Sequence, residues 1–131
     1  MTQEEVRELW FQALESGEYQ QGTGRLRRKR STGGERFCIL GVLADVAIKH
    51  NLIQNYCWEP RPQPLCAFEL VKKGSFGQDI LRTSLSLPDE IADLAGIWWE
   101  TAGSIAEDND ALKFTFKDAR NYITKILNDE N

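Results

Sequence analysis

The sequence predicts a mostly α domain of the α+β class. About four helices surround a buried central helix at residues 38–50, and a small antiparallel β-hairpin occupies residues 24–37. Three patterns predict this fold: a long apolar segment from Phe37 to His50, helix-start signals followed by apolar residues at helical spacing near both ends of the chain, and a short basic run between glycine turns. A helix that is apolar nearly all round is normally buried, and about 14 residues are too few to span a bilayer. We therefore expect the other elements to pack around residues 38–50.

The two ends of the chain carry the clearest helix signals. Thr2 and Glu5 fit a capping box, and Gly17 is placed to end the first helix. Thr115 precedes apolar residues at helical spacing and predicts the start of the last helix. Between these ends, the sequence predicts a short helix after Pro88 and a further helical turn at residues 104–108.

Residues 24–37 predict a hairpin because a basic run and a short return strand flank a turn that contains two glycines. On such a strand, alternation turns Leu26 toward the core, with Arg28 and Arg30 on the same side. The other side then carries Arg25, Arg27 and Lys29.

Residues 51–86 predict no firm element. Pro60, Pro62 and Pro64 stand at alternate positions, which excludes a regular helix and favours an extended run. Residues 65–71 fit either a third strand or a short helix. The segment is interpreted as a long ordered loop or as the carrier of a site.

Composition predicts a single domain over residues 1–131 with its own core, since 41% of the residues are hydrophobic and 27% are charged. The net charge of −4 argues against a general nucleic-acid binder, but six of the sixteen cations lie between Arg25 and Arg36. Three cysteines cannot all pair, and the first residues do not resemble a secretory leader. We expect a reduced cytoplasmic protein that does not bind a membrane.

A further pattern runs through most of the chain outside residues 51–86. It consists of Trp10, Ala13, Leu14, Ser16, Gly17, Tyr19 and Gln21, then Phe37, Cys38, Leu40, Gly41, Val42, Leu43 and Asp45, then Leu87 and Pro88. This pattern resembles a group of small uncharacterised proteins of phages and prophages. The resemblance implies a phage or mobile-element setting in a bacterial host, and it implies no mechanism.

Cys38 stands at the start of the central helix, where the helix dipole favours a thiolate, and Gln20 or Gln21 could serve as an oxyanion-hole glutamine. The single histidine is His50, about 18 Å further along the same helix at 1.5 Å per residue. Two residues so far apart on one helix cannot form a dyad. Tight packing of a small buried thiol beside Gly41 is the favoured interpretation, and a cysteine hydrolase is the alternative.

No cofactor or metal site is predicted. Cys57 and Cys66 lack the close spacing of zinc ligands. Asp108 and Asp110 resemble a calcium loop over only three residues, because the glycine and the final glutamate of such a loop are absent. We interpret these acids as helix-end residues exposed to solvent.

Asp45 interrupts the apolar helix, and a buried carboxylate must be paired or hydrogen-bonded. The hairpin supplies the candidate partners Arg28, Arg30 and Arg36. A structural ion pair that fixes the hairpin is the favoured interpretation, and a ligand-facing carboxylate is the alternative.

The basic run allows three interpretations. It can be a solvated strand edge that discourages aggregation, an anion site for a nucleotide or a nucleic acid, or a patch for an acidic protein. Gly22 and Gly24 would permit close approach of phosphates to the backbone. The glycine-rich motif of nucleotide hydrolases is absent. Among Trp58, Trp98 and Trp99, an exposed indole would be an interaction hot spot.

The predicted function is that of a non-enzymatic accessory protein of a phage or mobile element. It would bind a host protein, another host macromolecule or a nucleotide-like ligand, and would act to modulate host defence. A hydrolase or transferase using Cys38 and a nucleic-acid-binding protein using the hairpin are the alternatives. The candidate binding residues are Gln21, Arg25, Arg27, Arg28, Lys29, Arg30, Arg36, Asp45, Trp58 and Trp98.

Overall fold

The computed structural model describes residues 1–30, 33–61 and 67–129. Within these ranges the chain forms five α-helices and two antiparallel sheets of two and three strands, with 46% of residues helical and 20% in strands. The prediction of a mostly α fold with one hairpin is therefore wrong. The three-stranded sheet is formed by Tyr56–Pro60, Phe68–Lys73 and Asp79–Thr83, in a segment for which no firm element was predicted.

The first helix, α1 (Gln3–Glu15), begins with the predicted capping box. The Thr2 hydroxyl accepts a hydrogen bond from the Glu5 amide at 3.1 Å, and the Glu5 carboxylate accepts one from the Thr2 amide at 3.0 Å. Trp10 is fully buried, and its indole N–H donates to the Ile39 carbonyl at 2.9 Å. This bond joins α1 to the first turn of the central helix.

The central helix, α2 (Ile39–Lys49), is confirmed as the buried core of the molecule, with residues 39–47 all buried. Cys38 is its N-cap and does not lie inside the helix. Gly41 lies against the backbone before β1, because a Cβ atom at this position would stand 1.8 Å from the Leu26 carbonyl oxygen. Only glycine permits this close approach.

The predicted hairpin is confirmed as β1 (Arg27–Lys29) and β2 (Glu35–Phe37), which pair antiparallel; residues 31 and 32 of the turn lie outside the described ranges. Single bridges extend this sheet on both sides. Gln21 pairs with Phe37 in parallel, and Arg28 pairs with Ala67 in antiparallel fashion. The hairpin is thus held between the segment after α1 and the second sheet.

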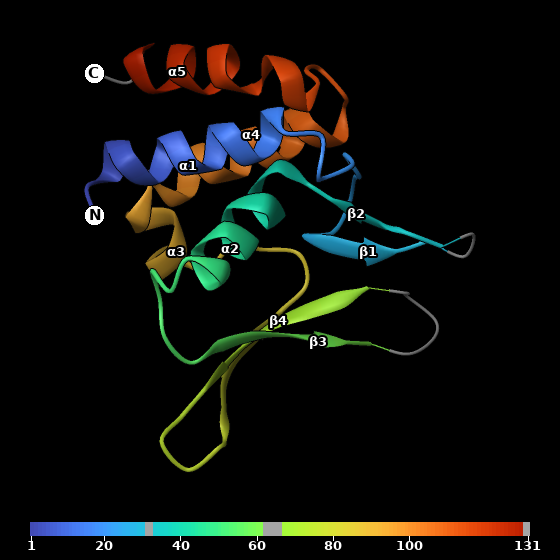
Figure 1. Cartoon of the computed structure of the whole chain (residues 1–131), viewed down its shortest axis with the longest axis vertical. Coiled ribbons are helices and arrows are strands. Elements are labelled where there is room, and N and C mark those ends of the chain that lie inside the picture. The colour runs from blue at the N-terminus through green and yellow to red at the C-terminus, as the bar shows by residue number, and fades with distance from the viewer. Residues whose placement is uncertain (31–32, 62–66, 130–131) are drawn as a thin grey trace.

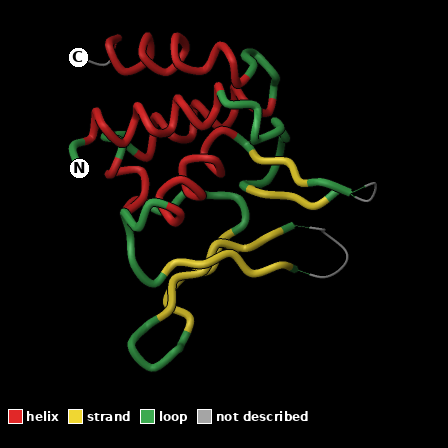
Figure 2. The backbone as a smooth tube through the Cα atoms, viewed as in Figure 1, coloured by secondary structure: helices red, strands yellow, loops and turns green. Residues whose placement is uncertain are grey.

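The second sheet has the order β3 (Tyr56–Pro60), β4 (Phe68–Lys73) and β5 (Asp79–Thr83), as Figure 2 shows. The interpretation of residues 65–71 as a strand is correct from Phe68 onward, whereas Pro62, Pro64 and Cys66 lie outside the described ranges. Trp58 and Leu70 are directly paired and pack on the core. The face that carries Glu59 and Arg82 instead holds a group of ion pairs.

The remaining helices cover the core on the side away from the sheets (Figure 1). They are α3 (Asp89–Leu94), α4 (Trp99–Asp110), the short 3-10 helix η1 (Phe116–Asp118) and α5 (Ala119–Asp129). The helix α4 is longer than the predicted turn at residues 104–108. Pro88 is the N-cap of α3, and the Thr115 hydroxyl donates to the Asp118 carboxylate at 2.9 Å, so it makes no backbone cap.

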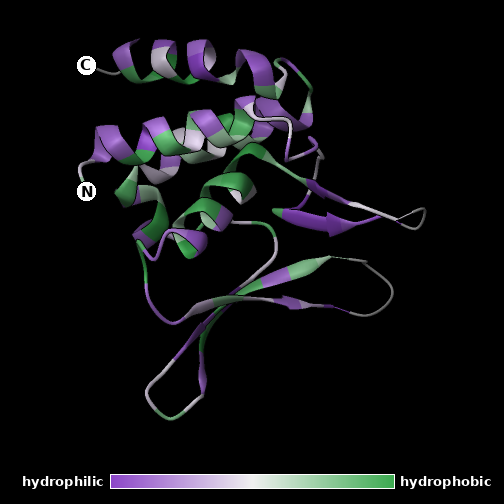
Figure 3. Ribbon diagram, viewed as in Figure 1, coloured by the Kyte–Doolittle hydropathy of each residue, from purple (hydrophilic) through white to green (hydrophobic). Residues whose placement is uncertain are grey.

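In Figure 1 the helices form the upper part of the molecule, the β1–β2 hairpin extends to the right at the level of α2, and the three-stranded sheet lies below. Figure 3 shows α2 as the most hydrophobic helix between these parts and β1 as strongly hydrophilic. Within the described residues, no helix combines the length and the apolar composition needed to cross a membrane.

Candidate functional site

Asp45 is buried, but its partners are not the predicted arginines. Its carboxylate accepts hydrogen bonds from the Tyr19 hydroxyl at 2.5 Å and from the Trp58 indole N–H at 3.0 Å, and the Lys49 ammonium lies 3.1 Å away. The pairing predicted with Arg28, Arg30 or Arg36 is wrong. Lys49 follows Asp45 by one helical turn and lies on the same face of α2, so the helix supplies its own cation. The Asp45 group therefore joins three segments of the core.

The hydrogen bonds around Asp45 also affect proton binding by its neighbours. Burial, assisted by the hydrogen bond to Asp45, raises the pKa of Tyr19 to about 12. The hydrogen bond to the Tyr19 hydroxyl raises the pKa of Lys49. At neutral pH the group thus contains a phenol and an ammonium ion, and both interact with Asp45.

Arg27 is the hairpin cation that turns into the protein. Its guanidinium forms an ion pair with Glu35 at 2.6 Å and lies 4.0 Å from the centre of the Phe68 ring. Phe37 makes edge contacts with both Tyr19 and Trp58. The side chains of Arg27 and Trp58 therefore pack and form hydrogen bonds within the fold. The alternation pattern predicts that Arg27 points away from the core, and this prediction is wrong.

Cys38 has a capping role. Its sulfur accepts a hydrogen bond from the Gly41 amide at 3.3 Å, and the side chain is 6% exposed. Burial raises the pKa of the Cys38 thiol to about 11, so desolvation outweighs the helix dipole, and the thiol stays protonated at neutral pH. His50 is the C-cap at the opposite end of the same helix.

Gln21 also has partners within the fold. Its amide donates to the side-chain oxygen of Asn109 at 3.2 Å and to the Phe114 carbonyl at 3.1 Å. Asn109 is fully buried, donates to the Gly22 carbonyl at 2.8 Å and accepts from the Ile39 amide. The sequence does not predict the burial of Asn109, because its acidic neighbours indicate solvent exposure. Its helical spacing from Ile105, four residues earlier, was the available signal.

The other hairpin cations form a basic surface around the hairpin. Arg28 and Arg36 stand directly opposite each other in the strand register. Each donates a long hydrogen bond to a backbone carbonyl, Arg28 to Thr23 at 3.4 Å and Arg36 to Gln21 at 3.3 Å. We define the basic surface as Arg25, Arg28, Lys29, Arg30 and Arg36.

In the described ranges, none of these five residues forms an ion pair. Elsewhere most cations are neutralised: Arg82 pairs with Glu59, Glu69 and Asp79, for example. Outside the basic surface, only the cations Arg7, Lys117 and Lys125 have no carboxylate partner among the residues described. The unneutralised positive charge of an acidic protein is therefore concentrated on one hairpin.

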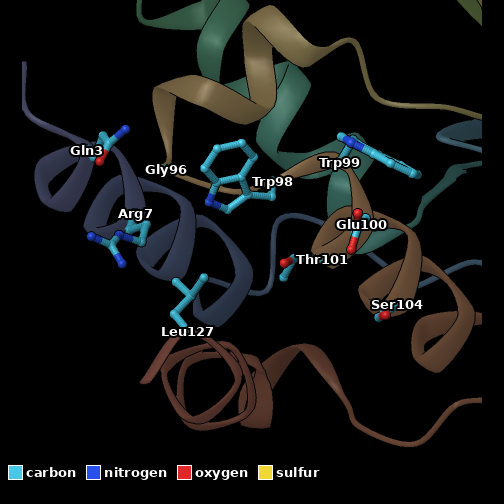
Figure 4. Close-up of a pocket in the computed structure, with 9 residues that line it drawn as sticks. All are labelled: Gln3, Arg7, Gly96, Trp98, Trp99, Glu100, Thr101, Ser104 and Leu127. Carbon is cyan, nitrogen blue, oxygen red and sulfur yellow. The ribbon is translucent and has the colours of Figure 1, made fainter. Parts of the chain in front are cut away.

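The side chains of Trp98 and Trp99 are 74% and 66% exposed. Trp98 lines a hollow of about 620 Å³ between α1, α4 and α5. Figure 4 shows its ring over this space, facing the side of α1 that carries Arg7, while Trp99 points to the other side of the chain. The hollow is separate from the basic surface.

No three histidine, cysteine, aspartate or glutamate side chains gather as a metal site in the ranges that the structure describes. Fold and surface together define a small protein of five helices and two antiparallel sheets that carries an unneutralised basic hairpin. The chain belongs to a family described as a domain of unknown function (DUF8296), whose sequence model matches residues 1–131. Neither a curated protein nor a solved structure matches the chain.

Proposed function

We propose that the protein is a non-enzymatic binding protein whose basic surface holds an anionic macromolecule, and that the phosphate backbone of nucleic acid is the ligand its chemistry fits best. The observation that carries this proposal is the position of Arg28 directly opposite Arg36, with no carboxylate partner for either among the described residues. Like charges at directly paired positions destabilise a sheet by up to about 1 kcal/mol. A bound anion would remove this cost.

The composition of the surface favours phosphate over carboxylate ligands. Four of its five cations are arginines, and the planar guanidinium group binds phosphate through two parallel hydrogen bonds. The exposed side chains of Arg28 and Arg30 lie on the face of the strand that also carries Arg36, whereas Lys29 is directed to the other face, because side chains alternate along a strand. Such a group of arginines on one face fits the regular spacing of phosphates along a strand of nucleic acid.

The phage or mobile-element setting of the protein is inferred from its sequence resemblance to phage and prophage proteins. It makes a macromolecule in the cytoplasm of a bacterial host the expected partner, and modulation of host defence the expected consequence of binding. The alternative of a hydrolase that uses Cys38 has less support, since the thiol is buried, caps a helix and has a raised pKa.

The proposal is tested by fluorescence anisotropy with labelled DNA and RNA duplexes at low and high salt. The wild-type protein should bind at low salt and lose affinity steeply as salt rises, because each neutralised phosphate releases bound counterions. The double variant Arg28→Glu with Lys29→Glu should weaken binding at least about tenfold.

The matched control is Lys117→Glu with Lys125→Glu, which changes the net charge equally at exposed positions on the helical side. This control should leave the affinity nearly unchanged. Equal losses in the two double variants, or no binding at low salt, would overturn the proposal. Stronger binding of polyglutamate than of either duplex would assign the surface to an acidic protein.

A further inference from the structure

A second surface lies near the two chain ends, away from the basic hairpin (Figure 1). Three adjoining hollows make a groove there. The largest, of about 620 Å³, shares Gln3, Gly96 and Trp98 with a hollow of about 300 Å³. It shares Arg7 and Leu127 with a third hollow, of about 240 Å³. We call this continuous surface the Trp98 groove. Because the three hollows follow one another along α1, the groove suits an extended segment better than a compact ligand.

Trp98 provides the groove with an exposed aromatic wall (Figure 4). Trp98 is the N-cap of α4 and has an extended backbone, with φ −74° and ψ 153°. It therefore precedes the first turn of the helix. Tryptophan is the aromatic side chain that binds cations most strongly through its ring face. Tryptophan is also enriched among residues that dominate binding energy at protein interfaces.

Each of the three hollows is lined by one carboxylate that has no ion pair within the described residues. These carboxylates belong to Glu100 in the largest hollow, Asp93 in the second and Glu4 in the third. Glu8 also lines the third hollow, but Arg120 neutralises it. Arg7 is the cation of the groove, so the unpaired charges sum to a negative surface.

We propose that the Trp98 groove binds an extended segment of a partner protein that carries arginine or lysine side chains. A cation of this segment lies against the ring of Trp98 and near Glu100, and further cations meet Asp93 and Glu4. Charge complementarity favours a basic segment over an acidic one, because an acidic segment would place its carboxylates next to the three unpaired carboxylates of the groove.

Titration with an oligo-arginine peptide tests the proposal, with an oligo-glutamate peptide as comparison. The indole N–H signal of Trp98, assigned with Trp98→Phe, should shift on addition of oligo-arginine and not of oligo-glutamate. Glu100→Gln should weaken oligo-arginine binding about two- to fivefold, the range of an exposed ion pair, and Arg7→Gln should strengthen it because it removes the one cation among the described residues that line the groove.

The control is Glu107→Gln, which removes the same charge from an exposed position on the same helix, in a residue with no ion pair among those described. It should leave binding unchanged. An equal effect of Glu107→Gln and Glu100→Gln, a shift with oligo-glutamate alone, or no shift with either peptide would overturn the proposal. Concentration-dependent dimerisation that Glu100→Gln abolishes would also overturn it, because a second copy would then be the occupant. Proposals for the two surfaces fail independently, since the hairpin variants do not alter the groove.

Discussion

At the residue scale, close approach of backbone segments is the tightest constraint in the core. Gly41 lies on the face of α2 that meets the Leu26 carbonyl. The helical residue Gly103, in contrast, has no atom within 4 Å of the position that a Cβ would take. The two glycines therefore have opposite requirements although both lie in helices.

Gly41→Ala should strongly destabilise the protein, because the added methyl group forces α2 away from Leu26. Gly103→Ala should stabilise it by about 0.5–1 kcal/mol, since alanine loses less backbone entropy in a helix. Urea unfolding followed by circular dichroism measures both changes. Equal effects of the two substitutions would show that the approach at Gly41 is not tight.

Asp45 is the second decisive residue. Asp45→Ala leaves the Trp58 indole N–H and the Tyr19 hydroxyl without their acceptor, and should lower the free energy of unfolding by about 2–3 kcal/mol. Asp129→Ala, at an exposed position, is the control and should change it little. An unchanged unfolding midpoint for Asp45→Ala, together with weaker nucleic-acid binding, would instead indicate that Asp45 faces a ligand.

The sequence predicts the burial of Asp45 and its need for partners, because a single acid interrupts an apolar helix. It does not predict which partners, since Tyr19 and Trp58 come close only after three separate segments have packed. The same holds for Asn109, whose burial depends on Gln21 and Gly22 from a distant part of the chain.

At the scale of elements, α1, α2 and the β1–β2 hairpin follow from local signals such as caps, apolar spacing and glycine turns. The three-stranded sheet does not. Its strands are consecutive in the chain, but three successive residues of β4 are buried and β5 is mostly exposed, so the sequence has weak hydrophobic alternation there. One face of this sheet is covered by charges that pair with each other. Lys73 and Arg82 are neutralised by Glu59 and Asp79 on this face.

Arg82 is the centre of this charged face, since it pairs with Glu59, Glu69 and Asp79. Arg82→Met should lower the thermal midpoint more than Lys113→Met, because Lys113 is exposed and, among the described residues, has a single ion pair, with Asp108. Added salt should reduce the difference between the variants. Equal midpoints at low salt would mean that the network does not stabilise the sheet.

At the scale of the whole molecule, the fold favours the protonated form of several side chains. Burial raises the pKa of Cys38 from 9.0 to about 11, and that of Tyr19 and Tyr56 from 10.0 to about 12. A raised pKa means that the folded state binds the proton more tightly than the unfolded state. This contribution to stability is complete below about pH 9 and is lost as the pH rises through 11 to 12.

The urea midpoint should therefore stay constant from about pH 7 to about pH 9 and fall steeply above about pH 10. Tyr19→Phe should make this fall shallower, since one of the titrating groups is removed. A midpoint that stays level up to about pH 11 would contradict the assignment of these buried protonated groups.

The central claim is that the basic surface is the place where an anionic macromolecule binds. The most direct measurement is a titration of the isotope-labelled protein with a short DNA or RNA duplex at low salt, followed by amide chemical shifts. We predict that the largest changes occur in β1, β2 and the Gly22–Gly24 segment, and that added salt reverses them. Changes centred on α4 and α5, or no change at low salt, would contradict the claim.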